Sequence, residues 1–356
     1  MTAPTRKLLG LVARLAIAVV LVGYLFHRMN LEHFHTALAA TLHRWPWLLA
    51  ALALTGAVLM LAAWRWLLIL RGLEIRSGWW RVLAVSFVGD FFNTFVLGAT
   101  GGDFVKGCYI VRETPQHRTR AVTSILIDRV VGMLALCLMV AVMILGQWRL
   151  LMSHSETRLV SRVALGVTAG VLLAGALAFG VHLWQLCPFL NRWESRPRIG
   201  RLIGILHRAY DACHLFRSRP LLLAGTLALS VGLQACAVVA TVCVGRALEL
   251  RIPFVEYFTF CPLVSLISSL PITPGGLGLR EGSAVHLLAA IGITADRAFL
   301  VAFLPYVCLL IWGLVGGVVF LGYSTRAPCP ATGPDPSGAP PAPRGPAPPD
   351  AGPAHP

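Results

Sequence analysis

Over residues 271–282 the chain reads Pro271-Ile272-Thr273-Pro274-Gly275-Gly276-Leu277-Gly278-Leu279-Arg280-Glu281-Gly282. The apolar runs on either side, 257–270 and 283–293, are each too short to cross a bilayer, because a spanning helix needs about 20 apolar residues. Irregular backbone at membrane depth is tolerated only where it is buried in protein or lines a cavity. The stretch therefore predicts a helix that is broken inside a membrane, at a binding site.

A second break of the same kind stands earlier, at Gly98-Ala99-Thr100-Gly101-Gly102-Asp103-Phe104-Val105-Lys106-Gly107. In both breaks a cation follows the first glycine of the Gly-Gly pair by five residues, Lys106 after Gly101 and Arg280 after Gly275. Broken helices in matching places of two halves are typical of transporters built from inverted repeats. The two breaks therefore predict a pseudo-inverted repeat.

The composition indicates a membrane protein. Hydrophobic residues make up 57% of the 356-residue chain and charged residues 13%, whereas soluble domains carry about 25% charged residues. The net charge is +15, but 26 of the 30 cations lie between or within apolar runs. We interpret them as orientation signals and contacts with anionic lipid headgroups, and we expect no nucleic-acid partner.

Six apolar runs predict complete transmembrane helices: 8–26, 46–70, 121–146, 162–184, 220–245 and 298–322. We interpret 82–98 and 257–293 as re-entrant hairpins, although two short tilted spans would have the same pattern. The fold class is then an all-α polytopic membrane protein. Its N- and C-termini face the cytoplasm, together with 71–81, 99–120 and 187–219, and the hairpins enter from opposite faces.

The arginines and lysines support this topology. Most lie in the segments expected in the cytoplasm, including seven arginines in 191–219, as the positive-inside rule requires. The segments expected outside hold only eight: Arg28, Arg44, Arg149, Arg158, Arg162, Arg246, Arg251 and Arg297. Amphipathic patterns in 30–44 and in part of 191–219 predict helices lying on the membrane surface.

Two domains are expected. Residues 1–326 form the membrane domain, with 8–26 retained as a span and not removed as a signal peptide. Residues 327–356 contain 12 prolines, a composition that predicts a disordered cytoplasmic tail. We expect no soluble catalytic domain.

Lys106 and Arg280 are the candidate ligands for an anion. Each follows a glycine-rich turn (Gly101 and Gly102, or Gly275 and Gly276), where backbone N–H groups and a helix N-terminus can receive a negative charge. The alternative is that the glycines only allow close packing and that the cations snorkel to the interface. Asp103 and Glu281 lie close to these cations in the sequence, and we expect them to hold or gate them.

Five further polar residues lie in the apolar segments. A charge inside a span costs about 2.5–3.5 kcal/mol on insertion scales, so Asp128 and Arg129 either anchor a neighbouring helix or face a cavity. Asp90 and Asn93 share a helix face, where they line the same cavity or cap a helix end. Arg65 is close enough to the end of its span to snorkel.

Signatures of enzymes, metals and cofactors are not found in the sequence. The nine cysteines have no C-x-x-C spacing, so we expect neither disulfides nor a metal site. H-E-x-x-H, G-x-S-x-G and P-loop motifs are missing, and we expect no cofactor.

These residues resemble those of a known family, the flippase-like membrane domain of lysylphosphatidylglycerol synthase/flippase, in its stand-alone form without the synthase domain. The resemblance covers about 8–323. It rests on Arg65, Asn93, Gly102-Asp103-x-x-Lys106, Asp128-Arg129 and Pro271-x-x-Pro274-Gly275-Gly276-Leu277-Gly278-x-Arg280-Glu281. The chain departs from the family where Gly98 or Ala99 replaces a frequent proline, and where Lys106 replaces a frequent arginine. Since lysine offers a point charge and not a bidentate fork, the headgroup preference tied to arginine does not transfer directly.

The resemblance implies a bacterial inner-membrane protein that moves a lipid between leaflets, and we expect a transporter more than an enzyme. Its ligand would be an anionic phospholipid or a polyprenyl-linked lipid, with Lys106 and Arg280 together holding the phosphate between the hairpins. Two other interpretations stay open. One is a membrane-embedded glycosyl or polyprenyl-phosphate transferase, and the other is a non-transporting subunit that binds a lipid-synthesis enzyme.

Overall fold

The computed structural model describes residues 38–39, 41–96, 101–153, 155–180, 219–270, 273 and 276–324. Most of these residues are helical and none is in a strand, which confirms the all-α class. The main helices are α3 (Trp45–Gly72), α4 (Trp79–Phe91), α5 (Gly101–Glu113), α6 (Arg118–Gly146), α7 (Trp148–Ser153), α8 (Ser155–Gly180), α11 (Pro220–Ala247), α12 (Phe254–Ser268), α13 (Leu279–Ala289) and α14 (Ala295–Ser324). A π-helix, Phe92–Val96, extends α4, and a 3₁₀ turn, Pro115–His117, precedes α6.

Four of these helices are long and apolar enough to cross a membrane: α3, α6, α11 and α14. They match the predicted spans 46–70, 121–146, 220–245 and 298–322 to within a few residues, and the chain is thus a multi-pass membrane protein. The predicted span 162–184 falls on α8, whose apolar stretch in the described residues is the shorter Val160–Leu173. The predicted span 8–26, the tail 327–356, and most of 30–44 and 191–219 lie outside the described residues.

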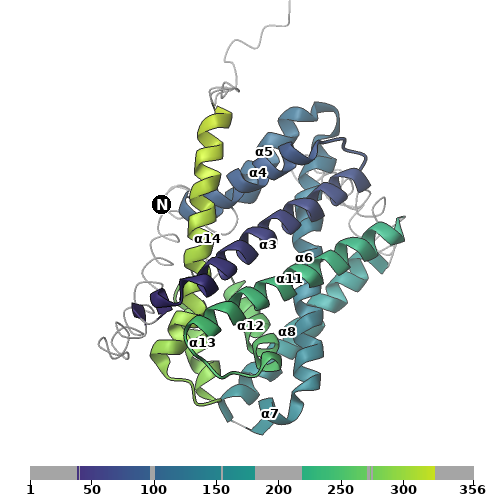
Figure 1. The fold of residues 1–356 in the computed structure, drawn as a ribbon. Helices are drawn as coiled ribbons and strands as arrows, with labels where there is room; N and C mark the ends of the chain where they lie inside the picture. The colour runs from purple at the N-terminus through teal and green to yellow at the C-terminus, as the bar shows by residue number, and fades with distance from the viewer. Residues whose placement is uncertain are drawn as a thin grey trace, which may run out of the picture.

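Helices α3 and α11 pack side by side along the middle of the molecule (Figure 1). They run antiparallel, because each begins where the other ends. Arg44, just before α3, forms an ion pair with Glu249, just after α11. At the other end Arg219, just before α11, donates to Glu74, just after α3, over 3.2 Å.

The two ion pairs repeat one another in the sequence. Arg44 and Arg219 are 175 positions apart, and so are Glu74 and Glu249. Both glutamates also adopt a left-handed backbone, with φ of 63° and 58°. The surrounding segments match as well, 71–76 reading Arg-Gly-Leu-Glu-Ile-Arg and 246–251 reading Arg-Ala-Leu-Glu-Leu-Arg. The predicted inverted repeat therefore extends beyond the breaks to the α3–α11 pair, around a pseudo-two-fold axis.

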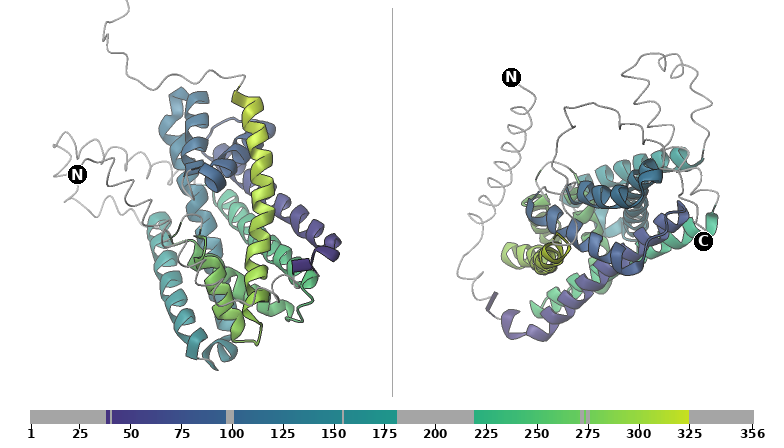
Figure 2. Two further views of the ribbon diagram at one scale, coloured as in Figure 1. Left: turned by 90° about the vertical axis from the view of Figure 1, so that its left-hand side faces the viewer. Right: turned by 90° about the horizontal axis from the view of Figure 1, so that it is seen from above.

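The two broken hairpins lie at opposite ends of α14, the helix that runs the length of the molecule (Figures 1 and 2). Helix α4 packs on the second half of α14, where the Phe91 and Phe320 rings stack 6.4 Å apart. Helix α13 packs on the first half, where Phe299 lies in a small cluster with Val285. This arrangement agrees with hairpins that enter from opposite faces.

The breaks have equal spacing in the sequence but different backbones. Gly101 and Gly102 are the first two residues of α5, whereas Gly276 and Gly278 precede α13 with φ of 73° and 78°, a conformation that glycine adopts without steric cost. Lys106 therefore stands in the second turn of its helix, and Arg280 in the first turn.

Candidate functional site

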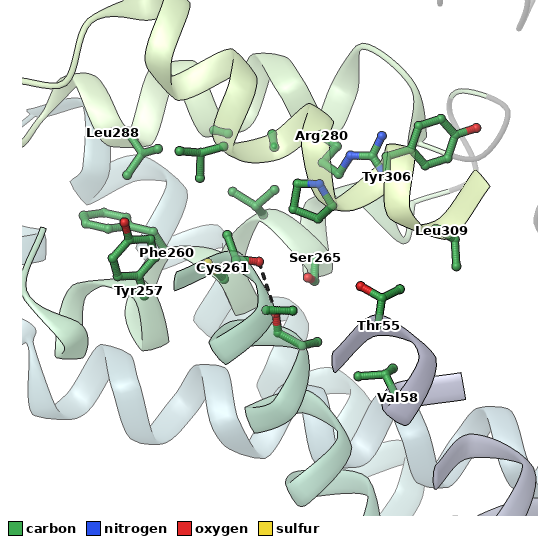
Figure 3. Close-up of a pocket in the computed structure, with 18 of the residues that line it drawn as sticks. Thr55, Val58, Tyr257, Phe260, Cys261, Ser265, Arg280, Leu288, Tyr306 and Leu309 are labelled. Carbon is green, nitrogen blue, oxygen red and sulfur yellow. Dashed lines mark hydrogen bonds between the residues drawn. The ribbon is translucent and has the colours of Figure 1, made fainter. Parts of the chain in front are cut away.

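A cavity of about 310 Å³ lies among α3, α11, α12, α13 and α14 (Figure 3). Apolar side chains such as Val58, Phe260 and Leu309 form most of its wall. Thr55, Thr241, Tyr257, Ser265 and Tyr306 add hydroxyl groups, and among the described residues of the lining Arg280 is the single charged one. Binding cavities for small molecules have this character, a mostly apolar wall with a few polar groups that fix orientation.

Arg280 is held rigidly at one end of this cavity. Its Nε and Nη2 donate to Oε1 of Glu281 over 3.1 and 2.6 Å, and its guanidinium carbon lies 4.3 Å from the centre of the Tyr306 ring. Glu281 is 1% exposed, and its other oxygen accepts the Gly278 N–H over 2.7 Å. In the described part of the chain Nη1 of Arg280 makes no hydrogen bond, so this face remains for a ligand.

Two of the helices that line the cavity contain a proline. Pro262 lies inside α12 and Pro305 inside α14, and Pro305 lines the cavity itself. A proline within a helix removes one backbone hydrogen bond and clashes with the preceding turn. Both helices are therefore locally weakened next to the cavity.

Lys106 lies in a different place. Its Nζ is 3.8 Å from Oδ1 of Asp90 and 5.8 Å from the centre of the Trp66 ring, and it does not line the Arg280 cavity. The structure thus does not bring the two cations into one site, contrary to the expectation that they grip one phosphate together. Since α13 packs at one end of α14 and α4, which carries α5, packs at the other (Figure 1), matching sequence positions end far apart.

Two further ion pairs involve residues of α3, α5 and α6. Arg65 donates through Nε and Nη2 to the two oxygens of Asp128, over 2.7 and 3.1 Å. Arg129 donates to Asp103 over 2.6 Å. The cluster of Arg65, Asp90, Asp103, Lys106, Asp128 and Arg129 has three cations and three carboxylates, so its formal charges balance.

Comparison with known proteins gives this architecture a family. The model of the family described as "Lysylphosphatidylglycerol synthase TM region" matches residues 11–317. The chain belongs to this family. A UPF0104 membrane protein of Methanothermobacter thermautotrophicus is 28% identical over 334 residues, covering 86% of this chain and 92% of the relative. A UPF0104 membrane protein of Pyrococcus horikoshii is 24% identical over 294 residues, covering 77% and 86%.

Membership of the lysylphosphatidylglycerol synthase TM-region family confirms the resemblance seen in the sequence and indicates a lipid-related membrane function. In this chain the surroundings of two residues, Asp103 and Arg65, differ from those expected from the sequence. Asp103 binds Arg129 and not Lys106, because Asp90 on the facing helix takes the lysine. Arg65 does not snorkel: it is 9% exposed, and Gly132 leaves room for its guanidinium, 3.1 Å from where a Cβ would stand.

The backbone N–H groups at the two breaks are partly used within the chain. Asn93 of the π-helix accepts the Gly102 N–H over 2.7 Å, and Glu281 accepts the Gly278 N–H. Gly102 also lies so close to α4 that a Cβ there would stand 1.9 Å from the Gly89 carbonyl oxygen. At the first break the glycine therefore serves close packing; Gly275 lies outside the described residues.

Sequence reasoning missed several residues of both sites. Ser230 accepts from Nη1 of Arg65 over 3.0 Å, and Tyr306 and Ser265 line the cavity with Arg280. Single hydroxyl groups in apolar helices carry little sequence signal. One sign was available, because Ser265 stands 175 positions after Asp90, at the repeat position that holds the lysine's partner in the other half.

Proposed function

We propose that this protein translocates a lipid with a phosphate-bearing headgroup across the bacterial inner membrane. The observation that carries the proposal is Arg280, the one charged side chain that the described residues place in a mostly apolar cavity of about 310 Å³. An arginine held by a buried carboxylate offers its remaining N–H groups to an anion in a fixed geometry. The acyl or polyprenyl tails would stay in the bilayer.

The balance of charges at Arg280 suits transient binding. Glu281 neutralises the guanidinium when the cavity is empty, so no uncompensated charge is left in an apolar environment. A phosphate would bind through Nη1 while Glu281 remains bonded to Nε and Nη2. The negative charge of Glu281 would also limit the affinity of the site for the anion. A transporter needs a limited affinity in order to release its cargo.

The Lys106 and Asp90 pair supports alternating access between two half-sites. It stands at the matching position of the other hairpin, and there too a carboxylate of the chain lies beside the cation. In one state the headgroup would displace Asp90 and bind Lys106. In the other state it would bind Arg280, so that it would pass from one hairpin to the other. Transporters with inverted repeats expose a site to each side by moving one repeat against the other.

Transport by reconstituted protein tests the proposal. Full-length protein in liposomes should move labelled phosphatidylglycerol between leaflets, and Arg280→Gln should lower the initial rate about tenfold or more, because a charge-assisted hydrogen bond contributes about 1.5–3 kcal/mol. Arg112→Gln, which removes an exposed arginine on α5, is the matched control and should change the rate less than about twofold.

Two results would contradict this function. One is an unchanged rate with Arg280→Gln. The other is a covalently altered lipid in the product, detected by mass spectrometry, which would favour the transferase.

A further inference from the structure

A second pocket, of about 490 Å³, lies at the end of the molecule where α3 begins and α11 ends. In Figure 1 this is the lower left, beside the start of α14. Seven residues line it: Arg44, Trp47, Arg246, Glu249, Leu250, Arg251 and Arg297. Four of the seven are arginines, and one is acidic. We call these residues the arginine pocket.

The arginine pocket carries unbalanced positive charge. Arg44 forms the ion pair with Glu249. Within the described residues the side chains of Arg246, Arg251 and Arg297 make neither a hydrogen bond nor an ion pair, so the lining has a formal charge of +3. Like charges this close repel one another, and an anion would relieve that repulsion.

The position of these arginines in the predicted topology is also unusual. All four belong to the eight arginines expected on the outer side, where the positive-inside rule disfavours cations. Half of these eight therefore gather around one pocket. Trp47 in the lining is 45% exposed, and tryptophan favours the depth of lipid headgroups. In the predicted topology the pocket would lie at the depth of lipid phosphates.

The other end of the molecule has the same kinds of residue, but there the glutamate pairs with two arginines. There Glu74 accepts from two arginines, Arg120 over 3.0 Å and Arg219 over 3.2 Å. Arg120 lies in the first turn of α6, much as Arg297 lies in the first turn of α14. At the arginine pocket Glu249 has a single arginine partner, and Arg297 has no ion pair in the described structure. A bound anion would give Arg297 the partner that Glu74 gives Arg120 at the other end.

We propose that the arginine pocket binds a phosphate group at the outer surface of the membrane. Guanidinium groups bind phosphate through paired N–H donors, and three of them are available here. The phosphate would belong either to a lipid headgroup or to a soluble phosphate compound. As a lipid site it would be the outer station of the proposed translocation path, and only this placement rests on the proposed function.

Binding to the purified full-length chain tests the site without transport. The probes are dihexanoyl phosphatidylglycerol and inorganic phosphate, titrated by calorimetry in a phosphate-free detergent. Arg251→Gln/Arg297→Gln should weaken binding about tenfold or more, since two charge-assisted contacts are lost. Arg76→Gln, at the repeat position of Arg251 on the other end, is the control and should change affinity less than about twofold.

A second variant works in the opposite direction. Glu249→Gln removes the acid of the pocket and should tighten binding several-fold, a gain that a poorly folded protein would not show. If both variants change the affinity for dihexanoyl phosphatidylglycerol in the expected directions, the pocket is a site for a lipid headgroup. If they change the affinity for inorganic phosphate instead, it is a site for a soluble phosphate compound. The proposal is overturned if neither probe responds to these variants, or if Arg76→Gln weakens binding as much as the double variant. Loss of transport in Arg280→Gln with phosphate binding intact would separate the two sites.

Discussion

Arg65 and Asp128 show how this chain keeps charges inside a membrane. Both oxygens of Asp128 accept from Arg65, and Ser230 accepts from its remaining nitrogen, so the guanidinium has partners on two neighbouring helices. The side chains are 10% and 21% exposed. A buried pair of this kind need not raise stability relative to apolar residues, but removing one partner leaves an uncompensated charge.

Asp128→Ala should therefore lower the free energy of unfolding by about 3–5 kcal/mol. Arg120→Gln, which removes one arginine from the exposed Glu74 cluster, should lower it by less than about 1 kcal/mol. Denaturant unfolding in a mild detergent measures both. Equal effects from the two variants would show that Arg65 reaches solvent when Asp128 is removed.

At the scale of the helices, small residues decide how closely the first hairpin packs on α14. A Cβ on Gly316 would stand 2.1 Å from the Phe87 carbonyl oxygen, and one on Gly317 would stand 3.0 Å from the Phe91 ring. Membrane helices that approach this closely use glycine because no apolar solvent effect drives them together. The glycines of α14 therefore hold α4 in place, and with it Asp90.

Gly316→Ala should push α4 away from α14 and destabilise the protein by about 1–3 kcal/mol, as overpacking does. Gly322→Ala on the same helix meets no atom within 4 Å and should be neutral, or stabilising by up to about 1 kcal/mol. The midpoint of thermal unfolding in detergent compares them. A midpoint for Gly316→Ala equal to that of the parent protein would contradict the close packing of these helices.

For the whole molecule, the pseudo-two-fold axis places equivalent residues at opposite ends. The α3–α11 pair crosses the centre, and the Arg44–Glu249 and Arg219–Glu74 pairs tie its two ends. Equivalent loops should then face opposite sides of the membrane. The structure is not symmetric in its contacts, because one end has two arginines on its glutamate and the other has one.

Arg76→Cys and Arg251→Cys test this arrangement, since both positions are exposed and are 175 residues apart. A membrane-impermeant maleimide applied to intact right-side-out membranes should label Arg251→Cys and leave Arg76→Cys unlabelled. Inverted vesicles should give the reverse, with labelling of the parent protein as background. Labelling of both from one side would rule out the inverted repeat.

The sequence by itself determined the helices and their interruptions. A backbone in hydrocarbon must satisfy its hydrogen bonds locally, so the lengths of apolar runs and the positions of glycine and proline suffice to place spans and breaks. The four long helices agree with the predicted spans for this reason. The family followed from the same local motifs, because they are contiguous in the chain.

Only the tertiary structure decided which charges meet. Asp128 and Arg65 are 63 residues apart in the sequence. Lys106 pairs with Asp90 and not with Asp103, which is nearer in the sequence, because Asp90 lies on the facing helix. The arginine pocket likewise collects residues from three helix ends. Such contacts depend on how the helices pack. Coulomb attraction alone does not select among the possible partners, because it is similar for many pairings. The paired breaks were therefore visible in the sequence, but their separation into two sites was not.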